Sequence, residues 1–103
     1  MAPDEKTMAI RRLGISSDVY DDLYAEFVSI ARHSAFLIET AKTAGDWHRI
    51  GKIAHSVKGM AANLGITMIF ESARAVETNA ARADDLPCVL TTTNEFLGKI
   101  GLL

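Results

Sequence analysis

The chain has 103 residues, 49% of them hydrophobic, with two prolines, one cysteine and a formal net charge of −2 at pH 7. This length suffices for one domain over residues 1–103 but not for two, and the scattered Lys and Arg residues argue against a nucleic-acid partner or a polybasic membrane patch. No apolar run approaches the roughly 20 residues that cross a bilayer, the polar N-terminus is unlike a secretory signal, and the lone Cys88 excludes an internal disulfide.

The first predicted helix covers about residues 4–13 and stops before Gly14, a residue type favoured just after a helix. The second begins after Ser16 or Ser17, either of which can cap it, and ends at Gly45. Its apolar residues recur every three or four positions, which is typical of a core-facing helix. The predicted inward residues are Tyr20, Leu23, Phe27, Ile30, Ser34, Leu37 and Ala41.

The third predicted helix is capped by Asp46 and ends at Gly65. The fourth is capped by Thr67, and Asp84, Asp85 and Pro87 mark the turn before the last helix. Both helices show the same spacing of three and four. The inward residues are Trp47, Ile50, Ala54, Val57, Ala61 and Leu64 in the third helix, and Ile69, Ala73, Val76, Ala80 and Ala83 in the fourth.

In the last helix the predicted inward residues are Leu86, Val89 or Leu90, Thr93, Phe96 or Leu97, and Ile100. No segment alternates apolar and polar residues with the period of two that indicates a strand. We therefore expect an all-α fold, an up-and-down four-helix bundle over about residues 16–103, with the short helix 4–13 covering one end.

Two glycines, Gly51 and Gly59, lie in the interior of the third predicted helix, where each costs about 1 kcal/mol relative to Ala. Neither belongs to the inward stripe. Because a helix turns about 100° per residue, both lie within about 40° of His55, and Ala62 and His48 lie within about 20° of it. His55 is therefore expected on the solvent side among small residues, where another protein can approach it.

Two lysines flank His55, each about one turn away and about 60° around the helix. The Lys58 ammonium is expected to reach a dianionic group on the imidazole, while Lys52 steers an acidic partner site, an effect that salt would screen. A free imidazole has a pKa of about 6.5 and is largely neutral and nucleophilic at pH 7. A nucleophile, a cation and a clear approach are what phosphoryl transfer to nitrogen requires.

The run AHSVKGMAANLG at residues 54–65 resembles the His-x-x-Lys-Gly-x-x-x-x-x-Gly signature of histidine phosphotransfer (HPt) domains. Val76-Glu77 on the next helix resembles the hydrophobic-Glu pair of that family. The helical pattern fits the family fold from about Ser16 to the C-terminus. Position 57 is Val where many members have Leu, a conservative change in the core.

The resemblance implies that His55 is phosphorylated on Nε2, that Lys58 stabilises the phosphoryl group, that Gly59 leaves room for the partner and that Gly65 ends the helix. It implies a phosphocarrier rather than a kinase, with aspartates of response-regulator receiver domains, or of a hybrid sensor kinase, as donor and acceptor. No cofactor is expected on this chain, since Mg²⁺ belongs to the receiver in this family. Consistently, the glycines form no phosphate-binding loop.

Helix geometry, rather than the resemblance, suggests that His48, Gly51, Lys52 and Ala62 form the docking surface around His55. No metal site is expected, because no Cys or carboxylate completes a set with His48 and His55. We expect a monomer in the cytoplasm. The structural interpretation is favoured for several further residues. His33 and His48 are interpreted as surface histidines, Glu71 and Glu77 as part of a solvated face, and Phe27 and Trp47 as core residues. Met60 and Met68 either fill gaps in the core or belong to the docking rim, and Cys88 serves as a small apolar residue.

Three classes of function remain open from the sequence. The first is the phosphocarrier of a multistep relay. The second is an HPt-like docking module that regulates a receiver or another enzyme without phosphorylation. The third is a helical enzyme with His55 as general base, which would need a pocket and a second titratable partner that the sequence does not clearly offer.

Overall fold

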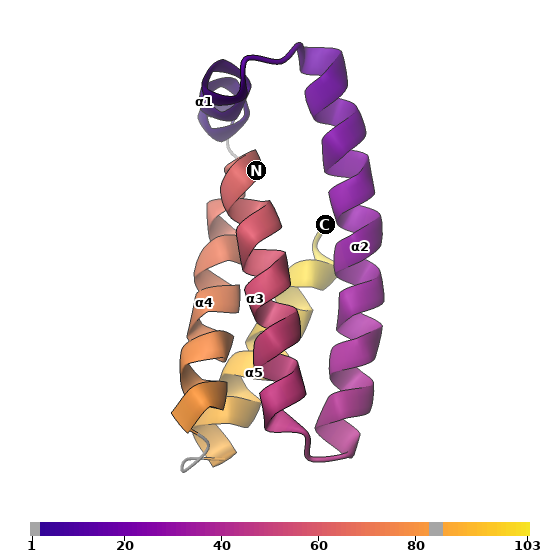
Figure 1. Cartoon of the computed structure of the whole chain (residues 1–103), viewed down its shortest axis with the longest axis vertical. Coiled ribbons are helices and arrows are strands. Elements are labelled where there is room, and N and C mark those ends of the chain that lie inside the picture. The colour runs from indigo at the N-terminus through magenta and orange to yellow at the C-terminus, as the bar shows by residue number, and fades with distance from the viewer. Residues whose placement is uncertain (1–2, 83–85) are drawn as a thin grey trace.

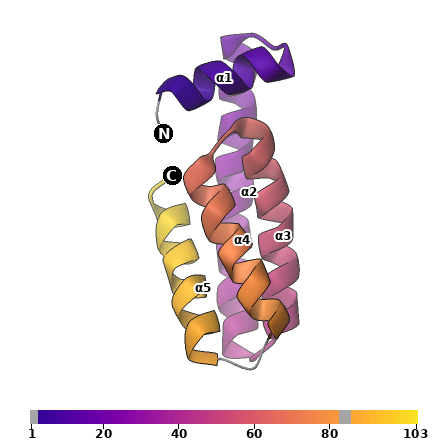
Figure 2. The same ribbon diagram turned by 90° about the vertical axis from the view of Figure 1, so that its left-hand side faces the viewer.

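The computed structural model describes residues 3–82 and 86–103, which form five helices and, within these ranges, no strand. The predicted all-α class is thereby confirmed. Four long helices run alternately up and down, and the first helix lies across one end of the bundle (Figures 1 and 2). The helices are α1 (Pro3–Leu13), α2 (Ser17–Thr43), α3 (Trp47–Leu64), α4 (Thr67–Arg82) and α5 (Leu86–Gly101).

The starts of α2 and α3 are capped as the sequence predicts. The Ser16 side chain accepts a hydrogen bond from the amide of Val19, and Asp46 accepts one from the amide of Arg49, both at 3.1 Å. Each side chain satisfies a backbone donor that has no partner inside the helix. Because these signals are local, the sequence places both helix starts correctly.

The turn between α3 and α4 differs from its prediction at one residue. Gly65 ends α3 in the left-handed conformation with φ 72°, as expected. Thr67, however, is the first residue of α4 rather than its cap, since the amide of Phe70 donates to the carbonyl of Ile66. Ile66 is only 3% exposed, so this short turn is held by an apolar residue in the core.

The buried side of α2 is shifted from the predicted one. Leu23 and Ile30 are 39% and 38% exposed, whereas Ala31 and Ile38 are fully buried. With about 100° per residue, Ala31 and Ile38 lie within about 40° of Phe27 on one side, and Ile30 lies about 60° away on the other. The spacing of apolar residues fits either side, so only the packed neighbours decide which one faces the core. Leu37 is likewise only partly buried.

The other predicted stripes are largely correct. Trp47 is half-buried, and Leu86, Leu90 and Cys88 are exposed. Residues 83–85, on which the predictions for Ala83, Asp84 and Asp85 fall, lie outside the described residues. The buried residues of the last three helices are Ile50, Ala54, Val57, Ala61 and Leu64 of α3, Ile69, Ser72, Ala73, Val76 and Ala80 of α4, and Val89, Thr93, Phe96 and Ile100 of α5.

Helix α1 closes the end of the bundle at which α3 terminates. The Arg12 guanidinium donates hydrogen bonds to the carbonyls of Ala62, at 3.0 Å, and Asn63. The Tyr20 hydroxyl of α2 donates to the carbonyl of Leu64 at 2.7 Å. These carbonyls belong to the last turn of α3, where the carbonyl of Ala62 also accepts from the amide of the capping Gly65 and those of Asn63 and Leu64 have no amide of the same helix within reach. Within the described residues, no helix is long and apolar enough to cross a membrane.

Candidate functional site

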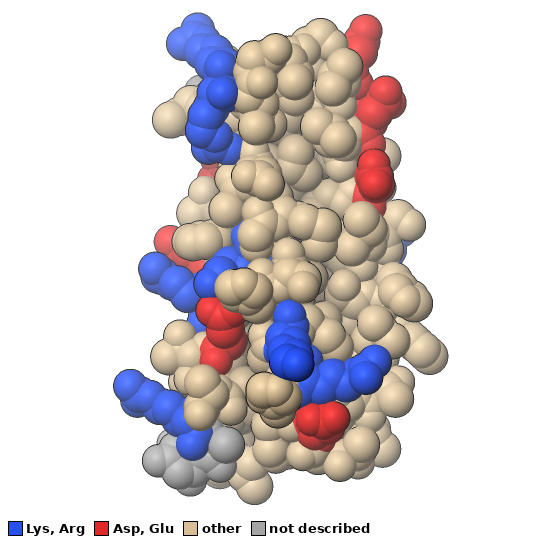
Figure 3. Space-filling model, in the orientation of Figure 1, with Lys and Arg blue, Asp and Glu red and all other residues tan. Residues whose placement is uncertain are grey.

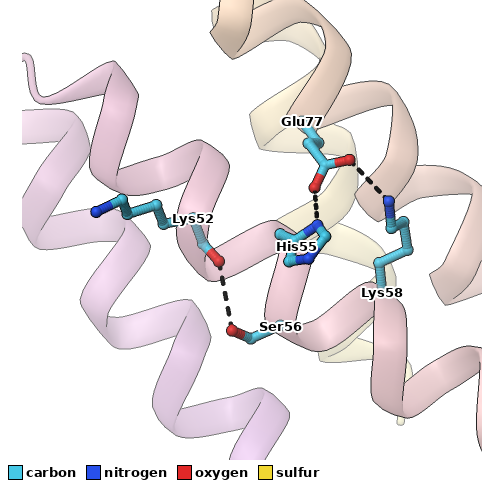
Figure 4. A network of polar contacts seen from close by, with 5 residues as sticks. All are labelled: Lys52, His55, Ser56, Lys58 and Glu77. Carbon is cyan, nitrogen blue, oxygen red and sulfur yellow. Dashed lines mark hydrogen bonds and ion pairs between the residues drawn. The ribbon is translucent and has the colours of Figure 1, made fainter.

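His55 lies in the middle of α3, on the outer face of the bundle, and its side chain is 70% exposed. Glu77 reaches it from α4, and Lys58 projects from the next turn of α3 (Figure 4). The three side chains therefore form one network across the seam between α3 and α4, the two helices that pack most extensively against each other.

The Glu77 carboxylate bridges the two residues of α3. Its Oε2 is hydrogen-bonded to Nδ1 of His55, and its Oε1 accepts a bond from Nζ of Lys58 at 2.7 Å. Because an ionised carboxylate can only accept, Nδ1 of a neutral His55 must carry the proton. The lone pair of the imidazole is then on Nε2, which has no hydrogen-bond partner among the described residues. The network thus selects one tautomer and leaves Nε2 free to react.

Glu77 is the site residue that sequence analysis misassigned. The sequence favours a solvated face for Glu77, yet its side chain is only 30% exposed and bonded at both oxygens. It also supplies the second titratable partner that the sequence did not clearly offer for His55. Residues 55 and 77 are equally distant from Ile66 in the tight turn, so an antiparallel helix pair brings them to the same level. This equal spacing from the turn, together with the Val76-Glu77 resemblance, is the sequence signal that could have paired Glu77 with His55.

The pKa of the Glu77 carboxyl is held below its ordinary value. The hydrogen bond from Lys58 is the main cause, desolvation opposes it, and the bond to His55 adds to the lowering. A lowered folded-state pKa means that the carboxylate stabilises the fold fully above the ordinary Glu pKa of about 4.3, and that this stabilisation is lost as pH falls through the folded value. The contribution of the Glu77 carboxylate should therefore be lost in acid.

Acid unfolding should report this coupling. Between pH 7 and about pH 3, the free energy of unfolding of the wild type should fall further than that of Glu77→Gln, because the variant has no carboxylate to protonate. Urea titrations at both pH values measure the difference. Glu71→Gln, an exposed position on the same helix, is the matched control and should behave as the wild type. Equal losses in the wild type and Glu77→Gln would contradict the coupling.

A groove runs between α3 and α4 beside His55. It brings together three of the four residues expected to surround His55 from helix geometry, and it also provides the pocket that the sequence did not reveal. The groove is lined by His48, Gly51, Lys52, His55, Ser56, Glu77, Ala80 and Ala81.

The two glycines of α3 have different surroundings. A Cβ atom at Gly59 would meet nothing within 4 Å, so this position is open, as expected. A Cβ atom at Gly51 would lie 3.3 Å from the Cβ of Ala80. Gly51 therefore also lies against α4, and its missing side chain lets α3 and α4 approach closely. Both glycines lower the stability of the helix itself. Gly51 allows α3 and α4 to pack closely, whereas Gly59 leaves open surface beside His55.

The remaining predicted residues lie around the network without joining it. The side chain of Lys52 is directed away from His55 (Figure 4). Ala62 is exposed on the last turn of α3, and His48 is exposed near its start. His33 is exposed on α2, outside both this network and the groove. Of the two lysines that flank His55, Lys58 is thus the one linked to it, through the shared bonds to Glu77.

A second groove lies between α2 and α3, toward the end covered by α1. Its lining is mostly apolar, and it includes the α2 residues whose predicted burial was wrong. The residues are Leu13, Leu23, Glu26, Phe27, Ile30, Met60, Asn63 and Leu64. Within the described ranges, no group of three or more His, Cys, Asp or Glu side chains is arranged to hold a metal ion.

Comparison with known families gives one match. The family model described as "Hpt domain" matches residues 22–97. The matched range contains all of α3 and α4, hence the complete network of His55, Lys58 and Glu77, and it excludes α1. No curated protein and no solved structure matches the chain.

Proposed function

Because this chain belongs to the Hpt domain family, whose members carry phosphoryl groups on histidine in phosphorelays, we propose that His55 is its phosphoryl acceptor. The donor is an aspartyl phosphate of a receiver domain, and the next acceptor is an aspartate of another receiver. The chain thus acts as a phosphocarrier with no kinase activity of its own. The observation that carries the proposal is the exposed His55, whose Nδ1 is held by Glu77 so that Nε2 is the nucleophile.

Transfer to His55 requires no proton to leave the imidazole. The Nε2 lone pair attacks phosphorus, the bond between phosphorus and the receiver's aspartate oxygen breaks, and that carboxylate leaves with the bonding electrons. The resulting phosphoimidazolium keeps its proton on Nδ1, which donates a hydrogen bond to the Glu77 carboxylate, and the negative charge of Glu77 offsets the positive charge of the ring. In the return step the protonated ring is the better leaving group. The same hydrogen bond therefore serves transfer in both directions.

Lys58 supplies the positive charge for the transferred group. In the unphosphorylated protein its ammonium is held by Glu77 at 2.7 Å, one helical turn from His55. A phosphoryl group on Nε2 carries nearly twice the negative charge of the Glu77 carboxylate, so it attracts the ammonium more strongly. We assign Lys58 the role of donating to a phosphoryl oxygen while Glu77 keeps its bond to Nδ1.

The receiver approaches His55 over the open surface at Gly59, with His48, Lys52 and Ala62 as contact residues. Lys52 is exposed and makes no ion pair with a described residue, so its charge is available to an acidic partner site. We propose that the receiver provides the Mg²⁺ for the reaction and that this chain contributes no cofactor. The setting proposed is the cytoplasm, and the working unit is the monomer.

Incubation with a ³²P-phosphorylated receiver domain tests the proposal. The wild-type chain should acquire an acid-labile, base-stable label, and ³¹P–¹⁵N NMR should place phosphorus on Nε2 of His55. A chain that binds the receiver but takes no label would instead favour a docking module that regulates its partner without phosphorylation. The absence of both label and binding across a panel of receivers would overturn both functions.

Substitution of Gly59 tests the open approach. Gly59→Glu should leave α3 formed, because its Cβ meets nothing and Gly is the poorer helix former. Its bulk and charge should nevertheless lower kcat/KM for transfer from the receiver about tenfold or more. Gly98→Glu is the matched control, since Gly98 is an equally open helical position on α5. Equal kcat/KM values for the two variants would show that the surface at Gly59 is not used.

A further inference from the structure

Gly51 and Ala80 face each other across the seam between α3 and α4. A Cβ atom at Gly51 would lie 3.3 Å from the Cβ of Ala80, whereas apolar carbons pack best at about 3.5–4.0 Å. Ala80 is only 5% exposed, and both residues line the groove beside His55. Because the separation of two packed helices depends on the side chains at their contact, the missing side chain at position 51 sets how close α3 and α4 lie here.

A methyl group at position 51 could not be accommodated by rotating a side chain. The position of a Cβ atom is fixed by the backbone, and the same is true of the methyl group of Ala80 that it would meet. The two carbons can therefore separate only if one helix moves, by a few tenths of an ångström at this level. Protein interiors are close-packed and transmit such strain to neighbouring contacts.

The bonds of Glu77 cross the same seam close to this contact. Gly51 precedes His55 by about one turn on α3, about 6 Å along the axis. Ala80 follows Glu77 by nearly one turn on α4. At the other end, the short turn at Ile66 joins the two helices. A widening of the seam at Gly51 therefore reaches the level of Glu77, while the turn holds the helices together beyond it.

The two bonds of Glu77 should respond differently to such a widening. The Lys58 ammonium is on a flexible four-carbon stem and can follow the carboxylate, whereas the imidazole of His55 is a rigid ring on a short side chain. Both reach Glu77 from α3 (Figure 4), and on this face of the molecule acidic and basic side chains adjoin one another over α4 (Figure 3). The bond between Glu77 and Nδ1 of His55 is thus the one that lengthens.

We propose that Gly51 is a positioning residue for phosphoryl transfer, because its lack of a side chain keeps α3 and α4 close enough for Glu77 to fix the Nδ1–H tautomer of His55. The inference rests on the proposed function of His55 and adds a residue that acts on the nucleophile through Glu77. Its effect belongs to kcat, since it concerns the geometry of the reacting group. The docking role expected for Gly51 from helix geometry predicts an effect on KM instead.

Ring ¹⁵N NMR of His55 tests the positioning without a receiver. Gly51→Ala should convert the Nδ1–H form into a mixture of tautomers at neutral pH, because a lengthened bond to Glu77 no longer requires the proton on Nδ1. Gly51→Ala/Ala80→Gly removes the opposing methyl group and should restore the Nδ1–H form. This double variant keeps one glycine and one alanine at the contact, so its helix propensity equals that of the wild type.

Gly59→Ala is the matched control for this measurement. It makes the same change on the same helix, also one turn from His55, but its Cβ meets nothing within 4 Å and the wild-type tautomer should be kept. Circular dichroism should show all variants folded, since Ala is a better helix former than Gly. An unchanged tautomer in Gly51→Ala, or a mixture already present in the wild type, would overturn the proposal.

Transfer kinetics with a receiver that labels His55 give the second measurement. A misplacement of 1 Å can cost about 100-fold in rate, so a shift of a few tenths in Gly51→Ala should lower kcat about fivefold and leave KM unchanged. Gly51→Ala/Ala80→Gly should return kcat to within about twofold of the wild type. Gly98→Ala, at an open helical position on α5, should alter neither constant.

A raised KM with unchanged kcat in Gly51→Ala, not rescued by Ala80→Gly, would place Gly51 in the docking surface and refute the positioning role. The tautomer measurement involves no phosphorylation, so its failure leaves the role of His55 as acceptor intact. Conversely, a His55 that takes no label from any receiver leaves the tautomer result standing.

Discussion

Replacing His55 with glutamine is expected to reduce transfer of the acid-labile label to the background of the assay. Glutamine resembles imidazole in size and can still bond to Glu77, so the α3–α4 seam should remain folded. It has no lone pair on nitrogen that can attack phosphorus, because its amide nitrogen is conjugated with the carbonyl. No other histidine in the described residues has a carboxylate bonded to its ring. The loss should therefore be complete rather than partial.

His48→Gln and His33→Gln are the matched controls for this loss. His48 lies two turns from His55 in the same groove, and His33 is exposed on α2. Both variants should take the label at His55, with an effect of His48→Gln confined to KM. Circular dichroism and the urea midpoint should show that all three proteins are folded. Label that persists in His55→Gln would contradict the proposed function.

Glu77→Gln is expected to slow transfer about 100-fold through kcat, within the range found when a group acting on developing charge is removed. The variant keeps the shape of the side chain but loses the negative charge that offsets the phosphoimidazolium. Its amide can either donate or accept, so Nδ1 is no longer required to carry the proton. Lys58 also loses its anionic partner. Nucleophile orientation and charge stabilisation are thus weakened together.

The tautomer of His55 separates this role from a merely structural one. ¹⁵N NMR of the wild type should show the Nδ1–H form, and Glu77→Gln should show a mixture of both tautomers at neutral pH. Glu71→Gln should match the wild type in tautomer and in rate. A wild-type kcat in Glu77→Gln, or an unchanged tautomer, would show that the hydrogen bond does not position the nucleophile.

The architecture was predictable because its signals are local. Caps at Ser16 and Asp46 and the left-handed Gly65 depend on a few consecutive residues, and the buried stripe of α3 follows the helical period. His55 could be placed on the outer face by the same rule. Periodicity alone did not decide which flank of α2 is buried, since Leu23 and Ile30 fit a helical stripe as well as Ala31 and Ile38 do.

The parts that sequence analysis missed depend on how two helices meet. Glu77 bonds to His55 across 22 residues of chain, and helical periodicity alone does not distinguish it from the exposed Glu71. The sequence of α3 likewise does not indicate the close contact at Gly51, because Ala80 lies on the other helix. In both cases the deciding quantity is the register of α3 against α4, which the turn at Ile66 sets.

The attachment of α1 bears on the entropy of partner binding. The last two carbonyls of α3, of Asn63 and Leu64, have no backbone donor in the helix and would ordinarily bond to water. Arg12 and Tyr20 hold the carbonyls of Ala62, Asn63 and Leu64, so the end of the helix is ordered before any partner arrives. A preorganised surface loses little conformational freedom on association. Contacts of modest area can therefore suffice for binding at this end of α3.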